Sequence, residues 1–261
     1  RALLRRLALV DALTRRCALL LPQILRGEVS GVATLFPNGS NHLTEPLYRA
    51  TPLARFHNTA IAESVVNEVR RRLADGSRSN SAPIRIVEVG GGSASTTRAV
   101  LDALAHAGLL AAIAYHFTDI SPHFTLAASN EFGSRTTFAA TPFNIEATPE
   151  SQGITTHAAD ILIAANVLHA TANLRDALSH VASLLAEGAL SLILEGVTPH
   201  AWVDITFGTL PGWWHFSDHD LRPNYPLLSA DAWRALLAAA ALPCIGVVAA
   251  DPALGESVLL V

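Results

Sequence analysis

Short apolar runs alternate with helical patterns along the later part of the chain. The runs, each followed by turn or polar residues, are Ile84–Val89, Ile113–Thr118, Asp160–Ala164 and Ala189–Glu195. Apolar side chains recur at helical spacing between them, most clearly at Thr96–Ala107 and Leu174–Leu185. Alternating strands and helices are typical of right-handed βαβ units, whose helices cover both faces of a mostly parallel sheet. The pattern predicts an α/β fold with a doubly wound sheet.

The first part of the chain has a different pattern. Residues 1–75 contain no strand-like run, and their clearest feature is an amphipathic helix at Thr59–Leu73. The polar loop Asp75–Pro83 follows this helix. We therefore expect a helical lid subdomain over residues 1–80 and a core domain over residues 81–261.

The last residues predict one more sheet feature. The apolar runs Ile245–Ala250 and Ser257–Val261 are separated by Asp251–Gly255, which contains a proline and a glycine. Two strands that follow each other so closely must pair antiparallel. The sheet is therefore expected to end in an antiparallel hairpin.

Composition narrows the class of protein. Half of the residues are hydrophobic and 15% are charged, which supplies a sizeable core and excludes disorder as the main state. The net charge of -4 argues against nucleic acid as a general partner, because phosphate binding needs a basic face. The longest apolar stretch, Ala235–Ala250, is too short to cross a membrane. Cys17 and Cys244 form no disulfide framework, which favours a cytoplasmic location.

Two residue types are missing from the sequence. The chain has no lysine, which excludes a P-loop and Schiff-base chemistry. It also has no methionine and opens on Arg1, so we expect it to be a piece of a longer polypeptide.

A glycine loop follows the first predicted strand. Gly90, Gly91 and Gly92 precede a helix, and glycines allow both a tight turn and close approach of a ligand to the backbone. A nicotinamide fingerprint would need a third glycine at Ser95, so a nicotinamide reductase is disfavoured. Glu88, at the strand end, is placed to meet the amino group of an amino-acid-like cofactor.

The second strand ends at Asp119, a position where a carboxylate grips a ribose diol. The alternative for Asp119 is a helix cap or a surface turn. Together with Glu88 and the glycine loop, the acid favours a cofactor site.

Two further side chains follow later strands. His169 lies just past the Asp160–Ala164 strand, and Glu195 ends the Ala189–Glu195 strand. Carboxyl ends of parallel strands share one crevice, so the two groups can form a base and its partner. A helix-capping histidine and an unrelated strand-end acid explain these residues equally well.

Several motifs together resemble one enzyme family. They are Glu88-Val-Gly-Gly-Gly-Ser93, Phe117-Thr-Asp-Ile-Ser-Pro122, Asn144-Ile-Glu146, Ala164-Ala-Asn-Val-Leu-His-Ala-Thr171 and Phe207-Gly-Thr-Leu-Pro-Gly-Trp-Trp-His-Phe216. The set is similar to the S-adenosylmethionine-dependent C-methyltransferase domain of modular polyketide synthases, over most of the chain. The resemblance implies a class I methyltransferase fold, which is Rossmann-like, with S-adenosylmethionine as cofactor.

The resemblance also implies which residues bind the cofactor: Glu88, Gly90, Gly92, Asp119, Ile120, Asn144, Ile145 and Asn166. The first three would line the methionine part, Asp119 would hold the ribose, and Asn144 and Ile145 would flank the adenine. The sequence departs from the family at Ala94, usually glycine, and at Asn144, usually aspartate. We expect weaker rather than abolished binding, because an amide still bonds an adenine edge.

The implied substrate is a β-ketoacyl thioester on the phosphopantetheine arm of an acyl carrier protein, with neighbouring polyketide synthase domains as further partners. His169 would remove the α-proton as general base, and Glu195 would orient its ring. His57, where the family often has tyrosine, would either bond the substrate carbonyl or serve as a lid residue. Alternatives are an O- or N-methyltransferase domain and a scaffold domain without cofactor. No metal site is expected.

Two other groups of residues are of interest. An aromatic cluster either walls the acyl pocket or serves as packing: Trp213, Trp214 and Phe216. Surface arginines are expected to meet the carrier protein: Arg49, Arg55 and Arg222.

Overall fold

A single sheet organises the domain. The computed structural model describes residues 2–75, 82–242, 244–249 and 256–260, and within them the strand order is β3-β2-β1-β4-β5-β7-β6. The first five strands of the chain are parallel. They are β1 (Ile84–Val89), β2 (Ile113–Asp119), β3 (Thr137–Pro142), β4 (Ala159–Ala165) and β5 (Leu185–Gly196). The predicted α/β fold with a parallel sheet is confirmed, and the strand order reverses at β1 and β4, where such sheets bind ligands.

Two further strands extend the sheet beyond β5. β7 (Glu256–Leu260) pairs antiparallel with β5 on one side and with β6 (Gly246–Ala249) on the other. The turn expected at residues 251–255 lies outside the described residues. The hairpin as a whole therefore stays a prediction, while the antiparallel pairing of its two strands is observed.

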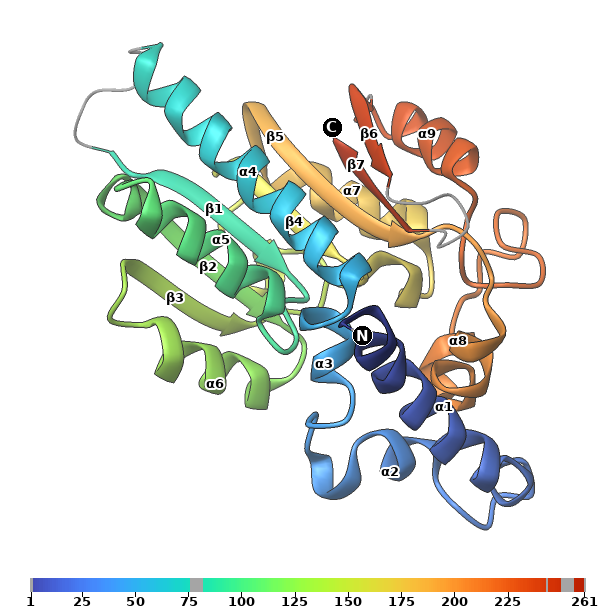
Figure 1. Cartoon of the computed structure of the whole chain (residues 1–261). Helices are drawn as coiled ribbons and strands as arrows, with labels where there is room; N and C mark the ends of the chain where they lie inside the picture. The colour runs from blue at the N-terminus through green and yellow to red at the C-terminus, as the bar shows by residue number, and fades with distance from the viewer. Residues whose placement is uncertain (1, 76–81, 243, 250–255, 261) are drawn as a thin grey trace.

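Helices cover both faces of the sheet, as Figure 1 shows. The helices on one face are α4 (Pro52–Ala74), α5 (Ser95–His106) and α6 (Pro122–Phe132), and those on the other are α7 (Leu174–Leu184) and α9 (Ala230–Ala239). Alternate residues of a strand point to opposite faces, so β1 contributes to both cores. Ile84 and Ile86 pack under the first set of helices, and Val87 and Val89 under the second.

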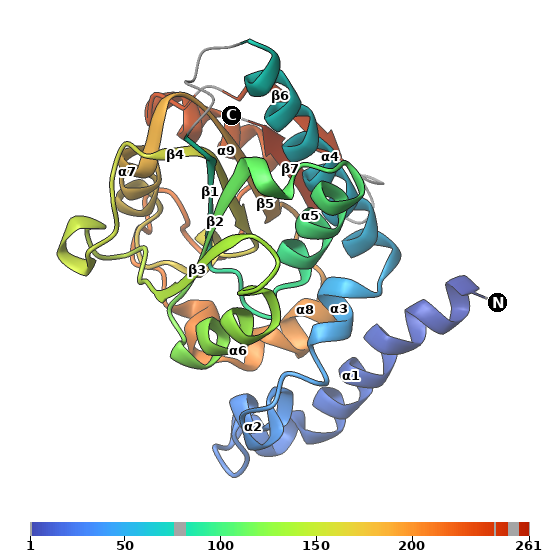
Figure 2. The same ribbon diagram turned by 90° about the vertical axis from the view of Figure 1, so that its left-hand side faces the viewer.

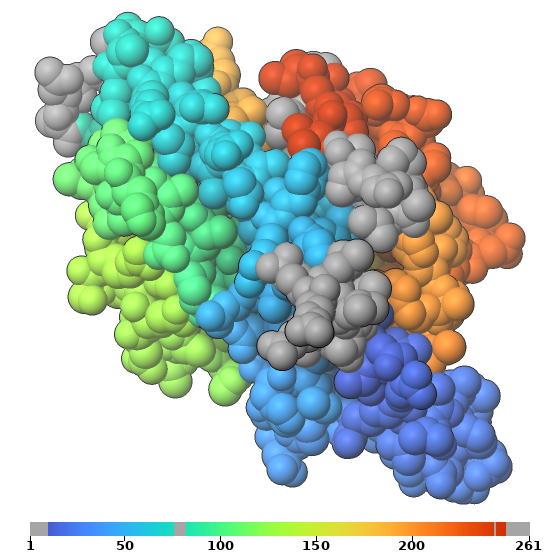
Figure 3. All heavy atoms as spheres, in the orientation of Figure 1, coloured from blue at the N-terminus to red at the C-terminus, as the bar shows by residue number. Residues whose placement is uncertain are grey.

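The N-terminal helices form a smaller lobe beside the sheet (Figures 2 and 3). Its helices are α1 (Ala2–Leu25), α2 (Gly31–Leu35), α3 (Glu45–Arg49) and, from later in the chain, α8 (Ala201–Ile205). Leu13, Cys17, Leu35 and Leu47 form its buried core. α4 packs on the sheet rather than in this lobe. The division of the chain into two parts at residue 80 stays a prediction.

The structure differs most from the predicted elements at β3, at the start of α4 and at the start of β5. β3 was not expected, because its residues alternate between exposed and half-buried and form no apolar run. α4 begins at Pro52 rather than Thr59, since Thr51 accepts a bond from the backbone N–H of Ala54 and starts the helix earlier. β5 follows α7 without a loop and begins at Leu185.

Candidate active site

The glycine loop joins β1 to α5 and has two kinds of glycine. A Cβ added to Gly90 would clash with the Val167 side chain, and one added to Gly91 would clash with the Phe117 ring, so these two permit close packing. Gly92 has a φ of +51°, and a Cβ there would meet no heavy atom nearer than 3.9 Å, the carbonyl oxygen of Gly90. The backbone at Gly92 is therefore open to a ligand.

Ala94 adopts an unusual conformation at the end of this loop. Its φ of +58° lies in the left-handed region, which costs a residue with a Cβ about 1–2 kcal/mol. Glycine, which the family resemblance leads one to expect here, would adopt this conformation freely. Ala94 therefore adopts this conformation at the cost of local strain.

Glu88 lies beneath the loop and is buried, with 1% of its surface exposed. Its Oε2 accepts hydrogen bonds from the hydroxyls of Thr97, at 2.5 Å, and Tyr115, at 2.7 Å. Burial raises the pKa of Glu88 to about 7; the charge of Asp119 adds to this, and the two hydroxyl bonds oppose it. The carboxyl is therefore poised between its two protonation states near neutral pH. Sequence reasoning did not identify Thr97 or Tyr115 as its partners.

Asp119 ties the end of β2 to the glycine loop. Its Oδ2 accepts from the backbone N–H of Gly92 and its Oδ1 from that of Ser121, both at 2.8 Å. Burial raises the pKa of Asp119, while these backbone bonds oppose the rise. A carboxylate has about four lone-pair directions, so two bonds leave acceptor capacity for hydroxyl groups.

The segment after β3 is held in place by several bonds. The Asn144 side-chain oxygen accepts from the backbone N–H of Glu146 at 3.0 Å, and the Asn144 backbone bonds Gln152 in both directions at 2.8 Å. The neighbouring Ile145 is buried, and its carbonyl bonds Nδ1 of His180 at 2.6 Å. Ile120, which follows Asp119 in the chain, is 66% exposed. Of these residues, Ile120 offers an exposed apolar surface, whereas the Ile145 side chain packs in the core.

Asn166 directly follows β4 and lies in the left-handed region, with a φ of +55°. Its backbone N–H donates to the carbonyl of Leu194 at 2.7 Å, which fixes the exit of the chain from the sheet. Asparagine tolerates this conformation better than most residues. The turn directs the following residues, among them Val167, toward the glycine loop.

His169 and Glu195 are brought together. His169 lies in the 3₁₀ helix Leu168–Ala170 after β4, and its Nδ1 is 2.6 Å from Oε2 of Glu195 on β5. The other carboxylate oxygen, Oε1, accepts from the backbone N–H groups of Leu168, at 2.7 Å, and Val167, at 3.2 Å. Glu195 is fully buried, whereas 12% of the His169 side chain is exposed. The ring is thus oriented through Nδ1, and Nε2 is the nitrogen available to a substrate.

Three aromatic residues were predicted either to wall the acyl pocket or to serve as packing, and one of them lies beside His169. The ring of Trp213 packs edge-on against His169, with centroids 5.2 Å apart. Trp214 is half exposed, and its indole N–H donates to the carbonyl of Gly208 at 2.8 Å. Phe216 is buried at some remove, beside the guanidinium of Arg222.

The expectation that Arg222 lies on the surface is wrong. Only 1% of the residue is exposed, because its guanidinium is enclosed by Asp218 and backbone carbonyls. It therefore cannot meet a carrier protein. Arg49 is exposed, with an ion pair to Glu45 at 3.1 Å, and Arg55 is exposed on α4.

His57 is fully buried in α4, where its ring packs edge-on against Phe56. Its neighbour Asn58 links α4 to α3 and to the start of α5: the amide donates to the carbonyl of Tyr48 and accepts from the Thr96 hydroxyl, both at 2.9 Å. A role for His57 in catalysis stays a prediction. No role for Asn58 was expected from the sequence, and its position shows that α4 braces the start of α5.

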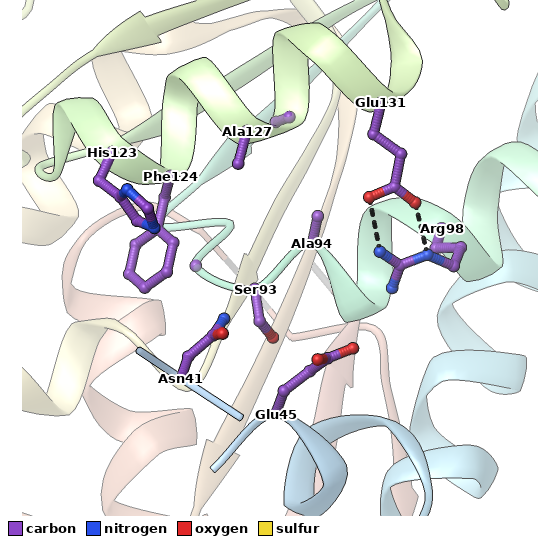
Figure 4. A pocket seen from close by; sticks show the side chains of 11 residues that line it. Asn41, Glu45, Ser93, Ala94, Arg98, His123, Phe124, Ala127 and Glu131 are labelled. Atoms are coloured by element: carbon purple, nitrogen blue, oxygen red, sulfur yellow. Dashed lines mark hydrogen bonds and ion pairs between the residues drawn. The ribbon is translucent and has the colours of Figure 1, made fainter. Parts of the chain in front are cut away.

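A cleft of about 180 Å³ adjoins the glycine loop on its α6 side (Figure 4). Its lining residues are Asn41, Glu45, Gly92, Ser93, Ala94, Arg98, His123, Phe124, Ala127, Ala128 and Glu131. Arg98 and Glu131 form an ion pair at 2.8 Å at one end. In the described part of the chain, no group of histidine, cysteine or acidic side chains could hold a metal ion. None of the helices described is long and apolar enough to cross a membrane.

Comparison with known proteins identifies the family. Residues 87–191 match the family described as a methyltransferase domain. The polyketide synthase PksR of Bacillus subtilis (strain 168) is 36% identical over 219 residues, which are 83% of this chain and 8% of PksR. The crystal structure of the CurJ carbon methyltransferase is 35% identical with a TM-score of 0.84, over 98% of this chain and 67% of that one. The trans-methyltransferase CalH, in complex with SAH, is 28% identical with a TM-score of 0.75, over 94% of this chain and 65% of that one.

These likenesses agree with the site. The chain spans only 8% of PksR but two thirds of the CurJ methyltransferase. The chain therefore belongs to the S-adenosylmethionine-dependent carbon methyltransferases found as domains of polyketide synthases.

Proposed function

We propose that this domain methylates the α-carbon of a β-ketoacyl thioester carried on an acyl carrier protein, with His169 as general base and Glu195 as its partner. The observation that carries the proposal is the contact of 2.6 Å between His169 Nδ1 and Glu195 Oε2 at the carboxyl ends of β4 and β5. This edge of the sheet is also where the glycine loop and Asp119 lie.

The residues present fit the cofactor. The open backbone at Gly92 admits a ligand, the remaining lone pairs of Asp119 suit a ribose diol, and exposed Ile120 offers an apolar face to an adenine. Glu88 suits the cationic end of the methionine part, beneath the same loop. When bound, S-adenosylmethionine supplies an electrophilic sulfonium methyl group.

The chemistry asked of the chain is proton removal. The α-carbon of a β-ketoacyl thioester lies between two carbonyls, so its C–H is acidic and yields an enolate. With Nδ1–H donated to Glu195, the unprotonated Nε2 of His169 accepts the α-proton, and the buried carboxylate stabilises the imidazolium that results. Since two backbone N–H groups also hold Glu195, it is fixed before substrate arrives.

The surroundings of His169 suit a tethered acyl chain. Trp213 forms an apolar wall edge-on to the imidazole, and the 12% exposure of His169 leaves the ring accessible from one side. A substrate on a phosphopantetheine arm reaches such a recessed base without its carrier entering the crevice. The domains that surround this one in a synthase would supply that carrier.

The test is His169→Ala, with His106→Ala as control, because His106 is an exposed histidine at the end of α5. Purified variants are incubated with a β-ketoacyl carrier protein and deuterated methyl donor, and products are read by mass spectrometry. We expect His169→Ala to lose methylation, by at least about 100-fold, while calorimetry with S-adenosylhomocysteine gives near wild-type affinity. Wild-type activity in that variant would overturn the mechanism, and label on oxygen or nitrogen would overturn the substrate.

A further inference from the structure

The loop that carries His169 is bound from below by one buried guanidinium. Arg222 Nη1 donates to the carbonyl of His169 itself at 2.9 Å. Its Nη2 donates to the carbonyls of Thr171, at 2.7 Å, and Ala172, at 3.2 Å. One side chain thus fixes three carbonyl groups in the stretch that connects β4 to α7.

Arg222 is itself held rigidly. Its Nε is 2.6 Å from Oδ1 of Asp218, and the two side chains are 0% and 1% exposed. The second oxygen of Asp218 accepts from the backbone N–H of Leu174 at 2.9 Å, where α7 begins. The Phe216 ring lies against the guanidinium, with 5.1 Å from Cζ to the ring centroid. The pair therefore connects the end of the His169 loop to the first turn of α7.

A buried ion pair is a poor device for stability alone. Removing two charges from water is costly, and apolar residues of similar size often serve equally well. What a guanidinium adds is a planar set of donors with fixed directions, which a hydrophobic side chain or a lysine lacks. Here those donors converge on the backbone of the residue that carries the base.

We propose that Arg222, held by Asp218, is a positioning residue for His169. Its bonds fix the position and orientation of the His169 backbone, so that Nδ1 contacts Glu195 and Nε2 faces the substrate. Orientation of this kind is sensitive, since a displacement of about 1 Å at a reacting group costs on the order of 100-fold in rate. The inference rests on the proposed role of His169 as the base.

The chain offers a matched control for this role. Arg72 is also nearly buried, at 11% side-chain exposure. It pairs with Glu68 at 2.6 Å and Asp160 at 3.0 Å, and it donates to the carbonyl of Gly188. Asp160 and Gly188 lie near the starts of β4 and β5, the opposite end of the strands from the dyad. Arg72→Lys removes the same donor geometry away from the site.

The experiment compares Arg222→Lys, Arg72→Lys and His169→Ala in the whole domain. Three properties are measured: affinity for S-adenosylhomocysteine by calorimetry, kcat and KM for methylation of a β-ketoacyl carrier protein, and deuterium uptake at the substrate α-carbon in D₂O. The uptake is measured with S-adenosylhomocysteine bound, after subtraction of the rate without enzyme. It reports proton removal separately from methyl transfer.

For Arg222→Lys we expect kcat and deuterium uptake to fall together, by about 10- to 100-fold, with KM and cofactor affinity within about twofold of wild type. Arg72→Lys should keep both rates within about twofold. If Arg222→Lys does not fold, Asp218→Asn is used in its place. This variant keeps an acceptor for the backbone N–H of Leu174 and weakens the ion pair that holds Arg222. We then expect a kcat loss of at least about fivefold.

The outcomes separate the two proposals. The positioning role alone would be overturned if His169→Ala is inactive and Arg222→Lys keeps unchanged rates. An equal loss in Arg72→Lys, with His169→Ala inactive, would do the same. Unchanged rates in Asp218→Asn, where that variant decides, would do the same. Full activity in His169→Ala would overturn the proposed function, and the positioning role with it.

Discussion

Replacing Glu88 with glutamine should change how the stability of the domain depends on pH. Burial raises the pKa of Glu88 from 4.5 to about 7. Below pH 4.5 the carboxyl is protonated in both the folded and the unfolded chain, and ionisation costs nothing. Between the two values the unfolded chain gives up the proton while the folded chain keeps it, so the free energy of unfolding falls as pH rises.

The size of this effect follows from the pKa difference. Each pKa unit corresponds to 1.36 kcal/mol. The raised pKa of Glu88 therefore lowers the free energy of unfolding by roughly 3 kcal/mol as the pH rises from 4.5 to 7, and this stability stays lost at higher pH. Glutamine has nearly the same shape, and its side-chain oxygen can accept from the hydroxyls of Thr97 and Tyr115 as the carboxyl does. Because it does not titrate, Glu88→Gln removes this pH dependence.

Urea unfolding at pH 5, 6, 7 and 8 measures the effect. The free energy of unfolding of Glu88→Gln minus that of wild type should rise by about 2–3 kcal/mol from pH 5 to pH 8, because part of the effect is already present at pH 5. Glu63→Gln, at an exposed position on α4, controls for loss of a carboxyl and should run parallel to wild type. A difference for Glu88→Gln that stays flat or falls with pH would refute the reasoning.

Two more predictions concern single contacts. Glu195→Gln keeps an oxygen for the backbone N–H of Leu168, but it no longer favours a proton on Nδ1 of His169. We therefore expect kcat for methylation to fall by about 10³- to 10⁴-fold, while calorimetry shows unchanged cofactor affinity. A loss of kcat below about tenfold would contradict an orienting role. Asn58→Ala removes the bonds to Thr96 and Tyr48 and leaves buried groups unpaired, so the free energy of unfolding measured in urea should fall by about 1–3 kcal/mol. Stability unchanged within about 0.5 kcal/mol would show that α4 does not brace the start of α5 through this side chain.

The sequence predicts the centre of the sheet better than its edges. β1 and β4 are buried on both faces, so they read as continuous apolar runs and were predicted close to their observed bounds. β3 lies at the edge, with exposed threonine, alanine and proline residues, and its run carries too little hydrophobicity to be recognised. Its pairing with β2 depends on tertiary contacts that no local pattern contains.

The same difference applies to the site. The contact of His169 with Glu195 could be expected, because parallel strands bring their carboxyl ends to one edge. Arg222 could not be placed, since an arginine in a polar, proline-containing segment resembles a solvent-exposed residue. Its burial depends on carbonyls some fifty positions earlier in the chain, at His169 and Ala172.

Val167 connects the two halves of the site. Its side chain fills the space that any Cβ at Gly90 would need, and its backbone N–H donates to Glu195 at 3.2 Å. The glycine loop, which we propose holds the methyl donor, and the carboxylate that we propose aligns the base are therefore both packed against the same residue. A larger or smaller side chain at position 167 is therefore expected to shift the glycine loop and the backbone N–H that holds Glu195 together. On the proposed mechanism, the volume of this one aliphatic side chain contributes to the spacing between the cofactor loop and the base.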